Sequence, residues 1–250
     1  MKHVTDIPVT HVASAFEVVS EHRKRWMYIA SALAFAAIAF VGFAPTYYLK
    51  AMYGAPPLSA LVHVHGLVFT TWLLLFFTQA FLVSAHRIDL HRRLGMVSAC
   101  FAILLVVIGW QTAVNASRLG HVPDGAAPLQ FLAVPLFSLV VFVALLGTGL
   151  YFRRRNREAH KRLMLLATLS ILGAPIARLQ LDIIHRYGPL ATFSLLSIVL
   201  IACIAIDTFK HRRLHPAMGW GGLLIVASVP IRLAISHTQA WLDFATWLTA

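Results

Sequence analysis

Ionisable and amide side chains interrupt the long apolar stretches of this 250-residue chain, where such groups are costly and usually serve a function. Three stretches place polar residues at i, i+4 and i+7, a spacing that puts them on one face of a helix. The three rows are Gln111, Asn115 and Arg118; Arg178, Asp182 and His185; and Arg232, Ser236 and Gln239, with His237 beside the third. The rows therefore predict side chains that converge at one depth.

Two further histidines, His63 and His65, stand near the start of another apolar stretch. Because they are two residues apart, they point about 200° apart on a helix and cannot both face one site. Trp72 follows His65 at an interval of seven, which favours the His65 face as the one directed into the bundle. We expect His63 to contact a neighbouring helix or to donate a hydrogen bond within the bundle.

Imidazole and carboxylate groups at a shared depth are typical ligands of haem iron and zinc. The candidate metal ligands are His63, His65, Asp182, His185 and His237. The candidate cofactor-binding residues are Arg178, Arg232, Trp72, Gln111 and Asn115. We expect either haem b in a redox protein, with the arginines at its propionates, or a transition metal such as zinc that assists hydrolysis. No catalytic residue can be assigned on either interpretation.

An alternative follows from the charges of the same residues. Arg178 and Asp182 lie one helical turn apart and can neutralise each other, which leaves Arg232 without an acidic partner in the apolar stretches. An unpaired arginine in apolar surroundings is costly, so we expect an anion beside it. Haem propionates, a lipid phosphate, a carboxylate substrate and Asp243 are the candidates. The alternative function is a binding protein or transporter for a small amphipathic anion.

The composition requires these residues to sit in a membrane. Hydrophobic residues make up 59% of the chain and charged residues 12%, with a mean hydropathy of +0.77. A soluble domain is about a quarter charged, so soluble, disordered and disulfide-scaffold proteins are excluded. Seven stretches have the roughly 20 residues that a spanning helix needs. They lie near Trp26–Leu49, Leu58–Ala85, Leu94–Ser117, Leu129–Phe152, Leu163–Ile184, Leu190–Phe209 and Met218–Ala240.

The sequence thus predicts an all-α, multi-pass protein with a segment at 1–25 and a seven-helix domain at 26–250. The formal net charge is +12, and 16 of the 21 basic residues lie before the first span or in the loops after spans two, four and six. The positive-inside rule then predicts a cytoplasmic N-terminus, an external C-terminus and contact with anionic lipid at the inner face. Nucleic acid is excluded as a partner, because the basic residues are divided among short loops.

Those basic loops repeat one short motif. It occurs as His91-Arg-Arg-Leu94, His160-Lys-Arg-Leu163 and His211-Arg-Arg-Leu214. The repetition predicts three hairpins of shared design after one N-terminal helix. Helix anchoring and lipid contact explain the basic residues. The histidines either cap the hairpin turns or line a second site on the inner face with His86 and His215.

These motifs also carry a resemblance. His63-Val-His-Gly66 with Trp72 and Gln79, Asp89-Leu-His-Arg-Arg-Leu-Gly95 and Glu158-Ala-His-Lys-Arg-Leu-Met164 resemble a family of uncharacterised bacterial inner-membrane proteins. The resemblance implies a location in the bacterial inner membrane and brings no function with it. A looser resemblance, to b-type membrane cytochromes and haem A synthase, implies histidine ligands on facing helices and a bound haem.

Overall fold

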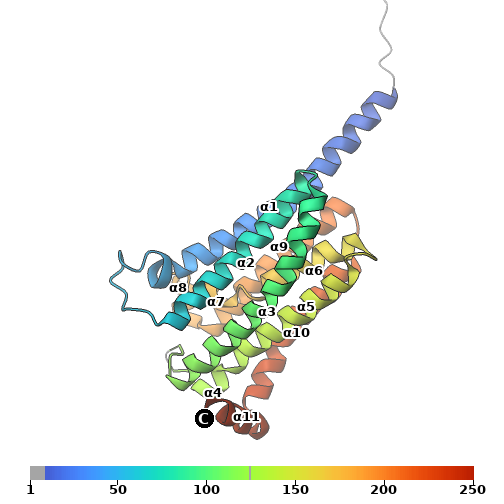
Figure 1. The fold of residues 1–250 in the computed structure, drawn as a ribbon. Coiled ribbons are helices and arrows are strands. Elements are labelled where there is room, and N and C mark those ends of the chain that lie inside the picture. The colour runs from blue at the N-terminus through green and yellow to red at the C-terminus, as the bar shows by residue number, and fades with distance from the viewer. Residues whose placement is uncertain (1–8, 124) are drawn as a thin grey trace, which may run out of the picture.

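The computed structural model describes residues 9–123 and 125–250, and within these ranges it contains helices and no strand (Figure 1). The long helices are α1 (Val9–Phe43), α2 (Ala60–Ser84), α3 (Ile88–Arg118), α5 (Ala133–Phe152), α9 (Pro189–His211) and α10 (Pro216–Ser236). The shorter elements are the π-helix η1 (Ala44–Tyr48), α4 (Pro128–Phe131), α6 (Arg157–Ser170), α7 (Gly173–Ile176), α8 (Asp182–Tyr187) and α11 (Gln239–Thr249). The all-α prediction is confirmed. The predicted segment at 1–25 falls partly outside the described residues, and α1 already begins at Val9.

Six helical segments are long and apolar enough to cross a membrane. They are Trp26–Tyr48, Ala60–Ser84, Ile88–Arg118, Pro128–Phe152, Pro189–His211 and Pro216–Ser236. Each corresponds to one of the predicted spans, with ends that differ by a few residues. The six segments indicate a multi-pass membrane protein.

The fifth predicted span, at 163–184, is not one helix, and this part of the prediction is wrong. α6 ends at Ser170, α7 makes a single turn, and residues 177–181 are not helical. Pro175 lacks the amide hydrogen that would continue the helical bonding, which accounts for the break. The apolar side chains of α6, such as Leu165 and Leu166, are completely buried. Of the non-helical residues 177–181, Leu179 is half-buried and the other four are exposed.

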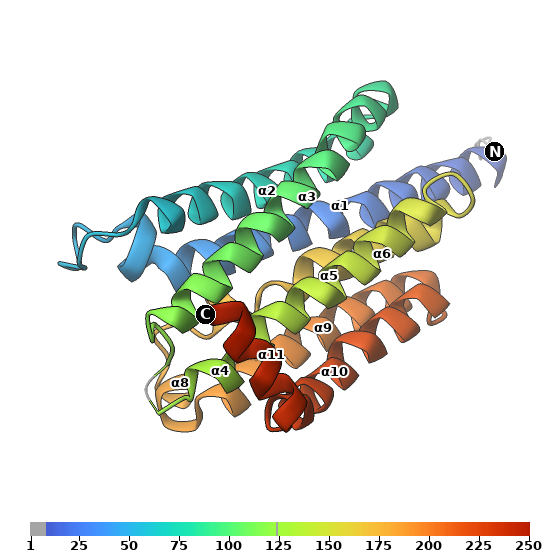
Figure 2. The ribbon, with the colours of Figure 1, turned by 60° about the horizontal axis from the view of Figure 1, so that its bottom comes forward.

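The long helices run between two ends of the bundle (Figure 2). One end holds the α2–α3, α5–α6 and α9–α10 turns, and we call it the basic end. Its exposed basic residues include Arg87, Arg153, Arg154, Arg155, Arg212 and Arg213. The opposite end holds the loop after η1 together with α4, α8 and α11. α6 starts beside the basic end and α8 lies at the opposite end, so the broken segment α6–α8 joins the two.

The opposite end is closed by α11, an element that the sequence analysis missed. The seventh span was expected to continue to Ala240, whereas α10 ends at Ser236 and Thr238 caps a new helix by accepting a hydrogen bond from the Trp241 amide at 3.3 Å. The Trp241 indole is 8% exposed, and its Nε1 donates to the Leu129 carbonyl oxygen at 2.8 Å. α11 is thereby held against α4, across the ends of the long helices (Figure 2).

Candidate functional site

The predicted metal ligands are dispersed over the half of the bundle away from the basic end. His63 is exposed on the first turn of α2, Asp182 and His185 are exposed on α8, and His237 is exposed where α10 ends. His65 is half-buried on α2. Within residues 9–123 and 125–250, no three histidine, cysteine, aspartate or glutamate side chains are grouped so that they could hold a metal ion. Metal binding therefore stays a prediction, because the described residues provide no group of three such ligands.

His65 and Arg178 do come close enough to interact electrostatically. The His65 ring stacks on Phe69 at a centroid distance of 4.2 Å, and its Nδ1 is buried without a hydrogen-bond partner. Arg178, which follows α7, places its guanidinium 5.1 Å from the centre of the Phe43 ring and donates to the Ala174 carbonyl oxygen at 3.1 Å. An imidazole and a cation from segments more than 100 residues apart thus share one region of the bundle.

The predicted pairing of Arg178 with Asp182 does not occur. The two residues were expected one turn apart on one helix, but the non-helical residues 177–181 separate α7 from α8. Both side chains are exposed, and no ion pair joins them among the described residues. The single-face row that included His185 is wrong for the same reason.

Arg232 is buried, with 5% of its surface exposed, and the acceptors of its hydrogen bonds to described residues are all neutral. Its Nε donates to the Ser228 carbonyl oxygen at 3.0 Å, and its Nη2 donates to the Ser228 hydroxyl at 2.5 Å. Nη1 donates to the Ser138 hydroxyl at 2.8 Å and to the Val134 carbonyl oxygen at 3.3 Å, both on α5. No carboxylate among the described residues pairs with Arg232. Asp243, one candidate anion, instead accepts a hydrogen bond from Gln239 on its own helix.

The other predicted cofactor-binding residues occupy different surroundings. Trp72 is 2% exposed, and its ring packs edge-to-face with Phe142 at a centroid distance of 5.2 Å. Its Nε1 has no hydrogen-bond partner. Gln111 is exposed on α3, and Asn115 is half-buried one turn further along. Trp72 is therefore a core residue between α2 and α5, with one unsatisfied polar atom.

The described residues also form an open cavity at the basic end, with a volume of about 190 Å³. We call it the basic-end cavity. It is lined by Asn156, Glu158, Arg162, His211, Arg213 and His215. These residues come from the start of α6, the end of α9 and the turn into α10. The cavity thus lies where three helix ends meet.

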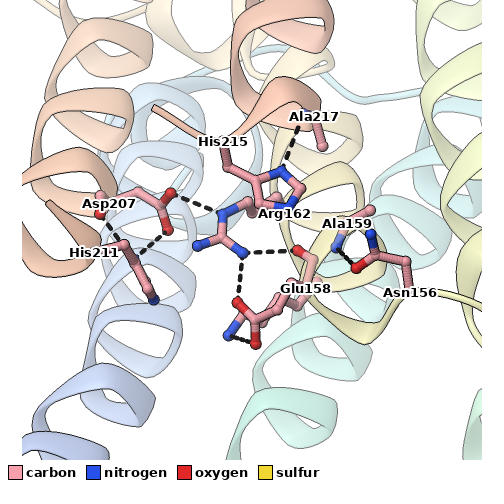
Figure 3. A network of polar contacts seen from close by, with 9 residues as sticks. Asn156, Glu158, Ala159, Arg162, Asp207, His211, His215 and Ala217 are labelled. Carbon is pink, nitrogen blue, oxygen red and sulfur yellow. Dashed lines mark hydrogen bonds and ion pairs between the residues drawn. The ribbon is translucent and has the colours of Figure 1, made fainter. Parts of the chain in front are cut away.

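The wall formed by α6 is fixed by its first turn. Asn156 caps the helix, accepting a hydrogen bond from the Ala159 amide at 3.0 Å, and the helix then places Glu158 and Arg162 one turn apart. Arg162 is only 1% exposed and bridges two carboxylates. Its Nε donates to Asp207 Oδ2 at 2.7 Å, and its Nη1 donates to Glu158 Oε2 at 2.6 Å (Figure 3). This bridge joins α6 to α9.

The two histidines of the cavity use the same ring nitrogen in opposite ways. His211 Nδ1 lies 2.8 Å from the carbonyl oxygen of Asp207, which can only accept, so Nδ1 carries the hydrogen. His215 Nδ1 accepts a hydrogen bond from the Ala217 amide at 3.1 Å, so a neutral ring carries its hydrogen on Nε2. Neither Nε2 bonds to a described residue. The neutral rings therefore offer one acceptor and one donor.

The charges around the cavity are nearly balanced, with a small positive excess. Lys161 Nζ donates to Glu158 Oε1 at 2.6 Å. Lys161 and Arg162 thus pair with the carboxylates of Glu158 and Asp207, and Arg213, which lines the cavity, is a third cation. Partial burial opposes ionisation of Glu158, but the hydrogen bonds from Lys161 and Arg162 outweigh it and lower the pKa of Glu158 to about 2. Both carboxylate oxygens of Glu158 are accordingly engaged.

Two of the five loop histidines come together at this cavity, and a second site there stays a prediction. His211 and His215 line the cavity, whereas His86, His91 and His160 are not among its lining residues. His160 Nδ1 instead lies 2.8 Å from the Gly149 carbonyl oxygen across the α5–α6 hairpin. Two spacings in the sequence pointed to the cavity: Glu158 to Arg162, and Asp207 to His211, each at i and i+4. The pairing of Arg162 with Asp207 had no such local signal.

No family model, curated protein or solved structure matches this chain.

Proposed function

We propose that this multi-pass membrane protein binds a small amphipathic anion through Arg232, in the half of the bundle away from the basic end. The observation that carries the proposal is a buried guanidinium whose acceptors, among the described residues, are all neutral. Arg232 is predicted from the sequence to bind an anion, and its burial without a counter-charge among the described residues gives the physical reason.

Hydrogen bonds to serine and carbonyl oxygens orient Arg232 but do not cancel its charge. A buried charge without a counter-charge is unfavourable, and a bound anion removes that cost. The guanidinium has five N–H groups and makes four hydrogen bonds, which leaves one N–H of Nη2 for a ligand. Phe193 lies 5.6 Å below the guanidinium and supplies an apolar surface beside it.

The broken segment α6–α8 supports the same proposal. Interrupted helices that free backbone polar groups are typical of binding sites at the centre of membrane transporters. Arg178 lies within the interruption and against Phe43, so the irregular backbone carries a second cation with an aromatic neighbour. An amphipathic anion has an acid group for such a cation and an apolar part for the rings.

The test measures thermal unfolding of the full chain in detergent with decanoate, with uncharged decanol and with neither. Decanoate is expected to raise the midpoint more than decanol does, and Arg232→Gln is expected to abolish that difference. Arg118→Gln is the matched control, because Arg118 is exposed and bonds to the carbonyl oxygens of Thr249 and Ala250. Equal effects of decanoate and decanol on the unsubstituted protein would contradict the proposal.

A second candidate, binding of haem b, rests on His65. Its buried Nδ1 has no hydrogen-bond partner, so this imidazole fits the role of an axial ligand. Bound haem would supply redox chemistry, and Arg178, which interacts with His65, would face a propionate. Zinc hydrolysis fits less well, because no group of three suitable ligands occurs among the described residues.

An absorption spectrum with metal analysis tests this candidate. Protein expressed with a haem precursor is expected to show a Soret band that His65→Ala removes and that His63→Ala, on exposed His63, leaves in place. Colourless protein without a stoichiometric transition metal would rule it out.

A further inference from the structure

The basic-end cavity is separate from the Arg232 site and has a chemistry of its own. We propose that it binds a phosphate monoester group, with Arg213 and the Nε2 atoms of His211 and His215 as the groups that contact the phosphate. The proposal does not rest on the function proposed for Arg232, because the two sites share no residue.

Arg213 lines the cavity, and it makes no hydrogen bond or ion pair to a described residue. The backbone explains its direction. α9 ends at Arg212, which adopts a left-handed conformation with φ of 56°, and the chain reverses there toward His215 and α10. As a result Arg213 lines the cavity and its neighbour Arg212 does not. The guanidinium of Arg213 can bind two oxygens of one phosphate.

The carboxylates behind the cavity are paired with cations. Arg162 donates to Asp207 Oδ2 and to Glu158 Oε2 (Figure 3), and Lys161 donates to the second oxygen of Glu158, while Asp207 Oδ1 lies 3.3 Å from His211 Nδ1. The charge left over is that of Arg213. It faces a cavity with one imidazole donor and one imidazole acceptor, and the acceptor, His211 Nε2, becomes a donor on protonation.

Size and charge favour a phosphate over other ligands. The cavity of about 190 Å³ exceeds the needs of a carboxylate. A phosphate monoester offers three oxygens to the guanidinium and the two rings. A cation is disfavoured because both Glu158 oxygens are taken. The exposed arginines of the α5–α6 turn, Arg153, Arg154 and Arg155, add a field that attracts anions.

The phosphate can come from a lipid headgroup or from a soluble molecule, since the cavity lies at the helix ends. Isothermal titration of the full chain in detergent compares inorganic phosphate with dioctanoyl phosphatidic acid, and dioctanoylglycerol serves as the uncharged control. Both phosphate probes are expected to bind, and Arg213→Gln is expected to weaken binding about tenfold, as for loss of a charged hydrogen bond. Arg212→Gln makes the same charge change one residue away and is expected to alter binding less than about twofold.

Every outcome of this titration either supports or overturns the proposed phosphate site. Tighter binding of phosphatidic acid than of inorganic phosphate would identify a lipid headgroup, and equal binding would identify a soluble ligand; both support the site. Absence of binding by both probes, or equal weakening by Arg213→Gln and Arg212→Gln, would overturn it. Arg232→Gln is expected to leave the binding of inorganic phosphate unchanged, whereas any part of phosphatidic acid binding that it removes belongs to the Arg232 site, so failure at this cavity and failure at Arg232 remain distinguishable.

Discussion

Arg162 Nε and Asp207 Oδ2 form a hydrogen-bonded ion pair of 2.7 Å between residues 45 positions apart in the chain. Both side chains are almost completely buried, at 1% and 0% exposure. The pair connects the first turns of α6 to the last turns of α9 and forms the rear wall of the basic-end cavity. It is therefore the contact on which the geometry of that end depends.

Removing one partner of this pair is expected to destabilise the protein strongly. Asp207→Asn leaves the Arg162 guanidinium buried with Glu158 as its sole carboxylate, and breaking a buried pair costs about 3–5 kcal/mol. The double substitution Arg162→Met with Asp207→Leu removes both charges and is expected to recover most of that loss. Unfolding of the full chain in detergent measures both effects, and a double variant no more stable than Asp207→Asn would contradict the expectation.

Acid is expected to weaken the same end through Glu158. Because the folded protein lowers the pKa of Glu158 from 4.5 to about 2, this residue contributes stability that is fully present above pH 4.5 and is lost as the pH falls toward 2. The melting temperature should therefore decline over that range. Glu158→Gln should melt lower at pH 6 and show a flatter decline, and parallel pH profiles for the two proteins would refute this.

α1 crosses α7 closely at Gly42, and we expect that no side chain is tolerated at this position. A Cβ there would overlap the carbonyl oxygen of Pro175, which is backbone and cannot move aside easily. Gly42→Ala should lower stability by about 1–3 kcal/mol, as overpacking does. Gly147→Ala on α5 is the control, since a Cβ at that position meets nothing within 4 Å. Thermal unfolding of the two variants tests the prediction, and equal stability would count against the close contact.

Docking of α11 is expected to depend on Trp241. Trp241→Ala removes the hydrogen bond to Leu129 and a buried ring, so amide hydrogen exchange across α11 should become faster. Trp247→Ala, on the same helix with a ring that is 72% exposed, should leave the exchange rates close to those of the unsubstituted protein. If the two variants exchanged alike, α11 would not be held through Trp241.

The sequence analysis located six of the spanning helices because each is a long apolar stretch, and composition alone identifies these. It failed at 163–184, where apolar composition continues through a break at Pro175. It also passed over Arg162, because one arginine among six basic residues of a loop resembles a lipid anchor. The distant partner Asp207 distinguishes it, and such a partner becomes visible only in three dimensions. The lack of a carboxylate partner for Arg232 among the described residues was easier to predict, because few carboxylates occur in the apolar stretches.

The position of α6 has a consequence for how the chain is assembled during synthesis. α6 has 14 residues and carries Arg162, so its own hydropathy gives it little tendency to leave the translocation channel for lipid. The counter-charge from Asp207 is not made until the ribosome has added 45 further residues. α6 is therefore expected to remain incompletely inserted until α9, the helix that carries Asp207, has been translated.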